Sequence, residues 1–192
     1  MRFIRSSLVV WVFAALSCLA VVRAEPPLPA APAAAGGDAV FVSGVPDRFD
    51  EVRAAVQRAR ETSGRRYRVI VVDGSAAEGD ARALLDRILS RWTAEVEAGT
   101  TAFDPTADLT ILLDTGHRLL AMKVPSDLEV RNGLDQQTIE EELIRKVFVP
   151  RARDGLYDKG LAELVTATET WVEEVQQKEV AQIEARRTFR TP

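Results

Sequence analysis

The chain has 192 residues, a formal net charge of −4 and a hydrophobic fraction of 46%. This balance excludes disordered, collagen-like and polytopic membrane proteins. One cysteine and one histidine are too few for a disulfide framework, or for a structural zinc site with about four ligands. The length is that of a single domain.

Residues 1–24 are predicted to be an export signal. Arg2 and Arg5 precede the uncharged, mostly apolar run Leu8–Val22, and small residues follow at the cleavage positions. The run is shorter than the roughly 20 residues that cross a bilayer as a helix, so a cleaved signal peptide is favoured and no transmembrane helix is expected in the mature chain. Lipid anchoring at Cys18 is the alternative. The chain is expected in the periplasm or on the outer face of the envelope.

The mature chain is expected to be acidic. Removing residues 1–24 takes away three arginines and no acidic residue, which leaves 22 basic against 29 acidic residues and a net charge of −7. Binding to nucleic acid needs clustered basic residues, so no such partner is expected. No Walker loop or G-x-G-x-x-G motif occurs, so no nucleotide is expected either. Residues 25–37 are mostly Pro, Ala and Gly and predict an extended spacer.

Residues 38–175 alternate short apolar runs with amphipathic segments. We predict strands where apolar and β-branched residues run together, and helices where apolar residues recur every three or four positions. The predicted elements are a strand at Ala39–Ser43, a helix opened by Pro46 and Asp47 and stopped by Gly64, a strand at Tyr67–Asp73, a helix at Asp80–Val96, strands at Asp108–Asp114 and Arg118–Val124, a helix from Asp135 to Phe148 that Pro150 ends, and a long helix from Asp158 through Val175.

The order β-α-β-α-β-β-α-α predicts an α/β fold, a single α/β/α sandwich with a small, mostly parallel four-stranded sheet. The last two strands are joined by Thr115-Gly116-His117, which predicts a three-residue hairpin with Gly116 supplying a positive φ. That hairpin adds one antiparallel strand at an edge of the sheet. Residues 176–192 are predicted to extend the last helix as a charged tail.

Two aspartates are the sharpest candidates for a site. Asp73 and Asp114 end predicted strands, and ligands of open α/β sheets favour the crevice beyond the carboxyl ends of the strands. Calcium takes oxygen ligands, so a calcium ion is the cofactor to expect if one is bound. The loop carboxylates that could join the two aspartates are Asp104, Asp108, Asp154 and Asp158. The competing interpretation is structural, because Asp-Gly and Asp-Thr-Gly are ordinary turn sequences.

The other reactive side chains give weaker evidence for a functional site than the two aspartates do. No serine lies in a G-x-S-x-G elbow, so His117 is predicted to be a surface histidine rather than part of a Ser-His-Asp site. Arg153 and Tyr157 lie in a short connection with two glycines, before the last helix. Either Gly155 makes the turn and Tyr157 packs beneath it, or Arg153 and Tyr157 line the site.

Several of these segments, in this order, resemble the TPM domain family, named for a thylakoid lumen protein, a photosystem II-associated protein and a nematode receptor-modulating protein. The resemblance covers about residues 38–175. It rests on Thr62-Ser63-Gly64 before RYRVIVVD, on Arg91-Trp92, on DLTILLDTGHRLLAMKV with Arg118 at the usual arginine, on Leu128-Glu129, and on the run from Pro150 to Leu161. Where the family has a glycine-containing loop after the hairpin, this chain has Pro125-Ser126-Asp127, and a loop of another path is expected there.

The resemblance implies a small α/β sandwich outside the cytoplasm or in a lumen, associated with membrane complexes. Calcium binding and a weak acid-phosphatase activity are attributed to some members. We therefore expect a non-catalytic binding or accessory module with an envelope or membrane-associated protein partner. The alternative is a metal-assisted phosphoesterase with Asp73 and Asp114 as cation ligands and Arg118 or Arg153 holding phosphate. Tyr157 is a further catalytic candidate.

Overall fold

The computed structural model describes residues 28–31, 39–74, 80–99, 103–104 and 106–188. The predicted export signal lies outside these residues, and so does most of the predicted spacer. The described part of the spacer, Leu28–Ala31, is named here the N-terminal strap. Its Leu28 and Ala31 side chains are partly buried against the domain, so these four residues of the predicted spacer contact the domain.

The sheet confirms the predicted fold class. Its strands lie in the order β1 (Val40–Ser43), β2 (Arg66–Val72), β3 (Asp108–Asp114) and β4 (Leu119–Lys123). The first three strands are parallel and β4 is antiparallel to β3, as the predicted hairpin requires. Parallel neighbours need a crossover, which is supplied by helix α1 (Asp50–Ser63) between β1 and β2 and by helix α2 (Ala81–Glu97) between β2 and β3.

The central strands are buried on both faces. Every residue of β3 is buried, and alternate residues of β2 belong to two separate cores. Val69 and Val71 face one core, whereas Ile70 and Val72 face the other, as the two-residue period of a strand dictates. The near-continuous apolar runs in the sequence follow from this double burial.

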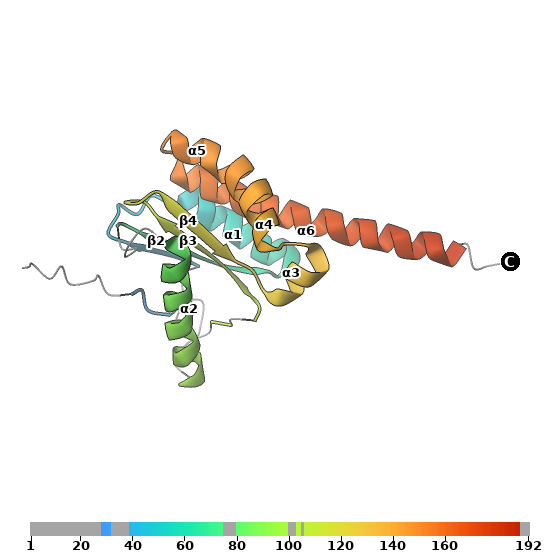
Figure 1. Cartoon of the computed structure of the whole chain (residues 1–192), viewed down its shortest axis with the longest axis horizontal. Helices are drawn as coiled ribbons and strands as arrows, with labels where there is room; N and C mark the ends of the chain where they lie inside the picture. The colour runs from blue at the N-terminus through green and yellow to red at the C-terminus, as the bar shows by residue number, and fades with distance from the viewer. Residues whose placement is uncertain (1–27, 32–38, 75–79, 100–102, 105, 189–192) are drawn as a thin grey trace, which may run out of the picture.

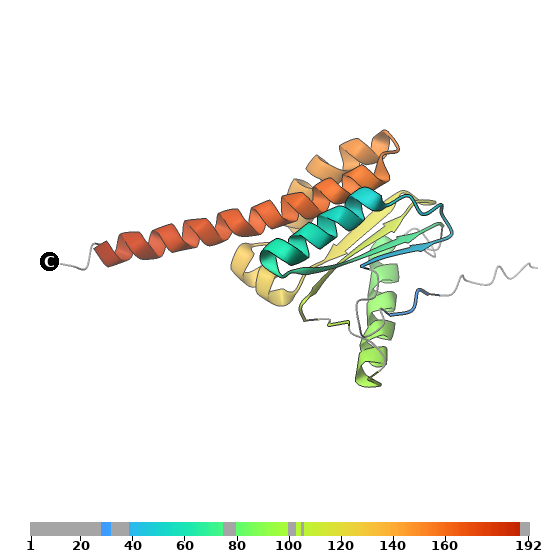
Figure 2. The same ribbon diagram turned by 180° about the vertical axis from the view of Figure 1, so that it is seen from behind.

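The two faces of the sheet are covered differently, as Figures 1 and 2 show. Helix α2 covers one face, where the fully buried Trp92 lies between Phe41 and Phe103, with ring centroids 5.4 and 5.2 Å away. Helices α1 and α6 (Tyr157–Thr188), together with the π-helical segment η2 (Ile139–Phe148), cover the other face.

The segment after β4 is helical where we expected a loop. Helix α3 (Ser126–Asn132) begins directly after Pro125 and ends at Gly133. The φ of Pro125 is −57° and its missing N–H is not needed at a helix start, so the proline fits there without cost. The helix buries Leu128 and Asn132 against the domain. The expectation of a loop was wrong because these tertiary contacts are not visible in a seven-residue segment.

Pro150 does not end the helix before it. The chain continues without a break through α4 (Gln136–Thr138), η2 and α5 (Val149–Arg153). The N–H of Val149 bonds to the carbonyl of Ile144, five residues back, and Pro150 then falls in the first turn of α5. A proline lacks the N–H that an α-helix interior needs, but a first turn tolerates it. The change from π to α hydrogen bonding supplies such a turn inside a continuous helix.

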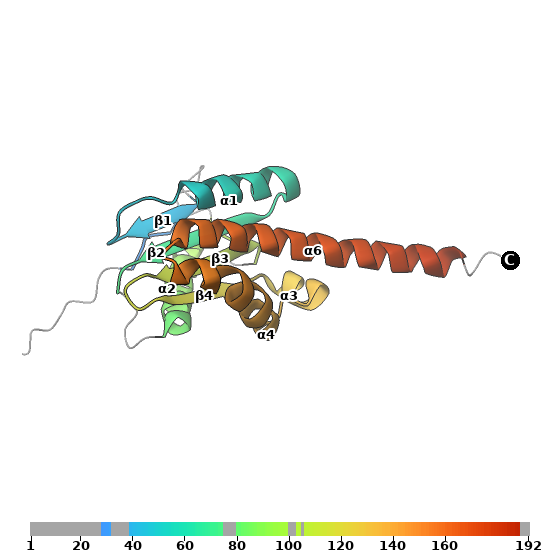
Figure 3. The ribbon, with the colours of Figure 1, turned by 90° about the horizontal axis from the view of Figure 1, so that it is seen from above.

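Helix α6 projects far beyond the sheet, as Figure 3 shows from above. Its 32 residues correspond to about 48 Å at 1.5 Å per residue. Val180 and Ile183 in the projecting part are 55% and 45% exposed. None of the helices in the described part of the chain combines the length and the apolar character that crossing a bilayer requires.

Candidate functional site

The structure brings Asp73 and Asp114 together at the carboxyl edge of the sheet. Asp114 is the last residue of β3 and stands opposite Val72, so Asp73 comes directly after the matching position of β2. The Thr115 hydroxyl lies 3.3 Å from Asp73 Oδ1 and 3.1 Å from the carbonyl of Val72, linking the β3–β4 hairpin to the end of β2. The predicted neighbourhood of the two aspartates is present.

The carboxylate of Asp114 is fully buried and surrounded by donors. Its Oδ1 accepts hydrogen bonds from the backbone N–H groups of Gly74 at 2.8 Å, Gly116 at 3.0 Å and His117 at 3.2 Å. Its Oδ2 lies 3.0 Å from the Nδ1 atom of His117. Asp114 therefore joins two loops from different strands, which is the structural role that its turn sequence predicts.

The hairpin loop differs from the predicted one. It contains four residues, Thr115–Arg118, and Arg118 has the positive φ, at 56°. Gly116 has no positive φ, so the expectation that it supplies one was wrong. Gly116 is instead required by space, because a Cβ there would lie 2.5 Å from the Gly74 nitrogen and 2.9 Å from Asp73 Oδ1. Arg118 is exposed in the hairpin loop, and β4 begins after it, at Leu119.

His117 is held more firmly than a surface histidine. Its side chain is 42% exposed, and its Nδ1 contacts the fully buried Asp114. A carboxylate at Nδ1 favours the tautomer with the proton on Nδ1 and the lone pair on Nε2, which is the arrangement of an imidazole that can accept a proton or bind a cation. The sequence D-T-G-H contains this pair, but the ring orientation depends on the hairpin, so pattern reasoning missed it.

The second group of predicted residues lies on the helical layer. The Asp158 carboxylate accepts hydrogen bonds from the N–H groups of Val52 at 2.8 Å and Glu51 at 3.0 Å, so it caps helix α1 from more than 100 residues away in sequence. Tyr157 stacks on Phe148 with ring centroids 6.5 Å apart. Gly155 makes the turn with a φ of 73°, which agrees with the structural interpretation of this connection.

Arg153 and Asp154 end helix α5 and are exposed. Within the residues that the structure describes, no group of three or more His, Cys, Asp or Glu side chains could hold a metal ion. The four predicted ligands Asp73, Asp114, Asp154 and Asp158 thus form no single cluster there.

Asp104 and Asp108 lie at the opposite edge of the sheet from Asp114. Asp108 is the first residue of β3, whereas Asp114 is the last, so the two cannot share a cation. The Asp108 oxygens lie 2.6 Å from Arg66 Nε and 2.9 Å from Arg68 Nε. A hydrogen bond from the Thr106 hydroxyl is the main cause that lowers the pKa of Asp104 below its usual value. These two carboxylates balance arginines, and the suggestion that they join the site was wrong.

The role of Asp158 as a cap predicts a stability effect. Asp158→Ala removes the acceptor for two N–H groups at the start of α1 and is expected to lower the free energy of unfolding by about 1 kcal/mol. Asp154→Ala is the matched control, because Asp154 is exposed and should change stability by less than about 0.5 kcal/mol. Urea unfolding of both variants measures the difference. Equal effects would mean that the Asp158 cap does not stabilise α1.

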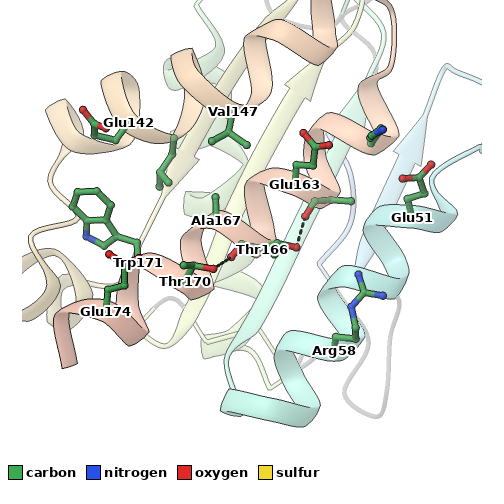
Figure 4. A pocket seen from close by; sticks show the side chains of 13 residues that line it. Glu51, Arg58, Glu142, Val147, Glu163, Thr166, Ala167, Thr170, Trp171 and Glu174 are labelled. Atoms are coloured by element: carbon green, nitrogen blue, oxygen red, sulfur yellow. Dashed lines mark hydrogen bonds between the residues drawn. The ribbon is translucent and has the colours of Figure 1, made fainter. Parts of the chain in front are cut away.

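A shallow groove of about 560 Å³ lies over the outer surface of α6, between α1 and η2. Figure 4 shows its lining. Small side chains of α6, among them Thr166, Ala167 and Thr170, line the groove, and Trp171 lies at one end. Small residues on a helix let another backbone approach closely, and the half-buried indole adds a large apolar contact. Sequence reasoning did not identify this surface, because its walls come from three separate elements.

Carboxylates dominate the charged residues that line the groove. The charged lining residues are Glu51, Glu142, Glu163, Glu174, Arg58 and Lys159. Three of these carboxylates have cationic partners in the protein: Glu163 pairs with Arg151 at 2.8 Å, Glu142 with Lys146 at 2.5 Å and Glu174 with Lys178 at 3.9 Å. A lining of small and apolar side chains, with four carboxylates against two cations, complements a cationic amphipathic segment better than an acidic or a purely apolar one.

Comparisons with known proteins support the fold alone. No known family profile matches the sequence, and no curated protein matches it. A solution structure of the N-terminal domain of a protein from P. gingivalis is similar with a TM-score of 0.54 at 16% identity, covering 71% of this chain and 83% of that one. The BA42 protein from Bizionia argentinensis has a TM-score of 0.50 at 10% identity, with 70% and 83% covered.

Proposed function

We propose that the chain is an exported, TPM-like binding or accessory module without catalysis of its own, and that it serves a membrane-associated complex of the cell envelope. The groove over α6 is the observation that carries this proposal. Its small and apolar side chains, and its four carboxylates against two cations, favour a protein partner that presents a basic amphipathic helix. The part of α6 that lines the groove, from Lys159 to Glu174, corresponds to about 24 Å, enough for four turns of a docked helix.

The alternative function, a cation-assisted phosphoesterase, has less support from the geometry. Of its two proposed ligands, Asp114 has hydrogen-bond partners for both carboxylate oxygens within the protein. Its proposed phosphate-binding residues, Arg118 and Arg153, belong to the hairpin loop and to the end of α5 respectively. The exposed His117 ring, like the exposed Asp73 and Arg118, could still contact a cation or a substrate at this edge.

A synthetic helix tests the binding function. We expect an 18-residue amphipathic peptide of leucine and lysine to shift the fluorescence of Trp171 in a saturable way, whereas the same peptide with glutamate in place of lysine should not bind. The double reversal Glu142→Lys and Glu174→Lys should weaken binding at least tenfold, because it removes the charge complementarity. Glu97→Lys, on the opposite face of the sheet, is the matched control. Unchanged binding of the leucine–lysine peptide to the doubly charge-reversed variant would contradict the proposal.

The same sample distinguishes the alternative. A cation that binds only the folded state stabilises it by about 2.7 kcal/mol at a hundredfold excess over its Kd, and this would raise the melting temperature by several degrees. A calcium-dependent rise that Asp73→Asn abolishes would favour the phosphoesterase. No shift with calcium, magnesium or chelator would leave the binding module as the better explanation.

A further inference from the structure

The N-terminal strap is held on α2 through its main chain. Arg91 Nη1 donates to the carbonyl of Leu28 at 2.9 Å, and the Trp92 indole N–H donates to the carbonyl of Pro29 at 2.9 Å. Glu95 Oε2 accepts from the N–H of Ala31 at 3.1 Å. Three side chains of one helix thus bind three backbone groups of the four-residue strap. Such contacts recognise the conformation of a peptide more than its side chains.

The three contacting side chains are held in place by their neighbours. Arg91 Nε and Glu95 Oε1 form an ion pair at 2.9 Å, one helical turn apart. Trp92 is fully buried, with its ring fixed between Phe41 and Phe103. Because little side-chain freedom remains to be lost on binding, the donors and the acceptor are already arranged for a ligand.

Proline-containing segments match this arrangement chemically. They favour the extended polyproline II conformation, which has no internal hydrogen bonds and leaves its carbonyl groups available to outside donors. Aromatic surfaces with an indole N–H are a recurring way to bind such segments. The Leu28 and Ala31 side chains add apolar contacts with the core that contains Trp92.

We propose that Arg91, Trp92 and Glu95 form a binding site for an extended, proline-containing peptide, and that the strap occupies this site in cis. A similar segment of another chain binds there once the strap is displaced. The site is on the opposite face of the sheet from the α6 groove, so it does not depend on the function proposed for that groove.

The covalent connection between the strap and the domain determines how tightly the site must bind the strap. Seven residues, 32–38, separate the strap from the first described residue of the strand region, and linkers this short give an effective concentration of about 1 mM. A strap that is docked nine-tenths of the time then needs an intrinsic Kd of about 0.1 mM or lower. A separate peptide with the sequence of residues 25–37 should bind the vacated site with this affinity.

The proposal is tested by hydrogen exchange of the Trp92 indole N–H. The protein used is residues 25–192, which contains every described residue. Trp92→Phe assigns the indole signal, which must be distinguished from that of Trp171. Leu28→Asp should release the strap and speed exchange at least tenfold, with an unchanged far-UV circular dichroism spectrum. Adding 1 mM of the peptide of residues 25–37 should restore protection, whereas the peptide with Leu28→Asp should not.

Two matched variants and a second release mutation complete the test. In the released protein, Glu95→Ala should weaken peptide binding at least fivefold, and Glu97→Ala, on an exposed position nearby, should not. Ala31→Asp should reproduce the effect of Leu28→Asp. Unchanged indole exchange in both release variants, or no protection by 1 mM peptide, would overturn the proposal, even if the basic helix binds the α6 groove normally.

Discussion

Asp114→Ala is expected to lower the free energy of unfolding by about 3–5 kcal/mol. The substitution removes the acceptor for three backbone N–H groups and the partner of His117, at a fully buried position. Each donor left without a partner in a buried or half-buried place costs about 1–3 kcal/mol. The midpoint of urea unfolding, at unchanged m-value, measures the loss.

Asp114→Asn separates the structural role of this residue from a role in cation binding. The amide oxygen can still accept the three N–H groups, and the amide nitrogen can donate to a neutral His117, so we expect a loss of only about 1 kcal/mol. If the alanine and asparagine variants are equally destabilised, the surrounding amides are not what Asp114 stabilises. If the asparagine variant keeps its stability but loses a calcium-dependent rise in melting temperature, Asp114 is a cation ligand as well.

Gly116→Ala is expected to destabilise the protein by about 2–3 kcal/mol, as overpacking against an immovable neighbour does. The added Cβ would lie 2.5 Å from the Gly74 nitrogen and 2.7 Å from the Gly74 Cα. Both atoms belong to the backbone, so no side-chain rotation can relieve the contact. The two loops would have to separate, which would also lengthen the hydrogen bond from Gly74 to Asp114. Thermal and urea unfolding should both detect the change.

Gly133→Ala is the control for Gly116→Ala. Gly133 has a φ of 62° and nothing within 4 Å of its added Cβ, so its substitution tests backbone strain without a steric clash. We expect it to cost about 1 kcal/mol, because an alanine rarely adopts a positive φ. If Gly133→Ala were as harmful as Gly116→Ala, the close approach of the two loops would not be the reason for glycine at position 116.

Part of the site could be predicted from the sequence because parallel strands impose it. Apolar runs ending in Asp73 and Asp114 identify two neighbouring strands, and their carboxyl ends must then meet at one edge. A role of Asp114 in its own turn could also be predicted, but the long-range partners of the carboxylates could not. The amide of Gly74 that binds Asp114 is 40 residues away in sequence, and the α1 amides that bind Asp158 are more than 100 residues away.

Local sequence patterns also failed to predict the structure at Pro150 and in the strap. Pro150 is an ordinary helix breaker by its sequence, but a π-helical segment before it places it in a first turn. The residues of the strap read as a spacer by composition, but α2 presents donors that match their carbonyl groups. The strap's partners lie 63 residues away in the sequence, whereas at Pro150 the change of hydrogen-bonding pattern is local but is not specified by the residue types.

The α/β class, the order of strands and helices, the parallel central strands and the acidic, cysteine-poor character of the domain could all be predicted from the sequence. These properties follow from residue periodicity and composition, which act over a few neighbouring positions. The loops and helix ends held by Asp114 and Asp158, the need for space at Gly116, and the surfaces of α6 and α2 that we propose as binding sites could be seen only in the folded structure. Each of these depends on distances between residues far apart in the chain, which arise only when the helices are placed on the sheet.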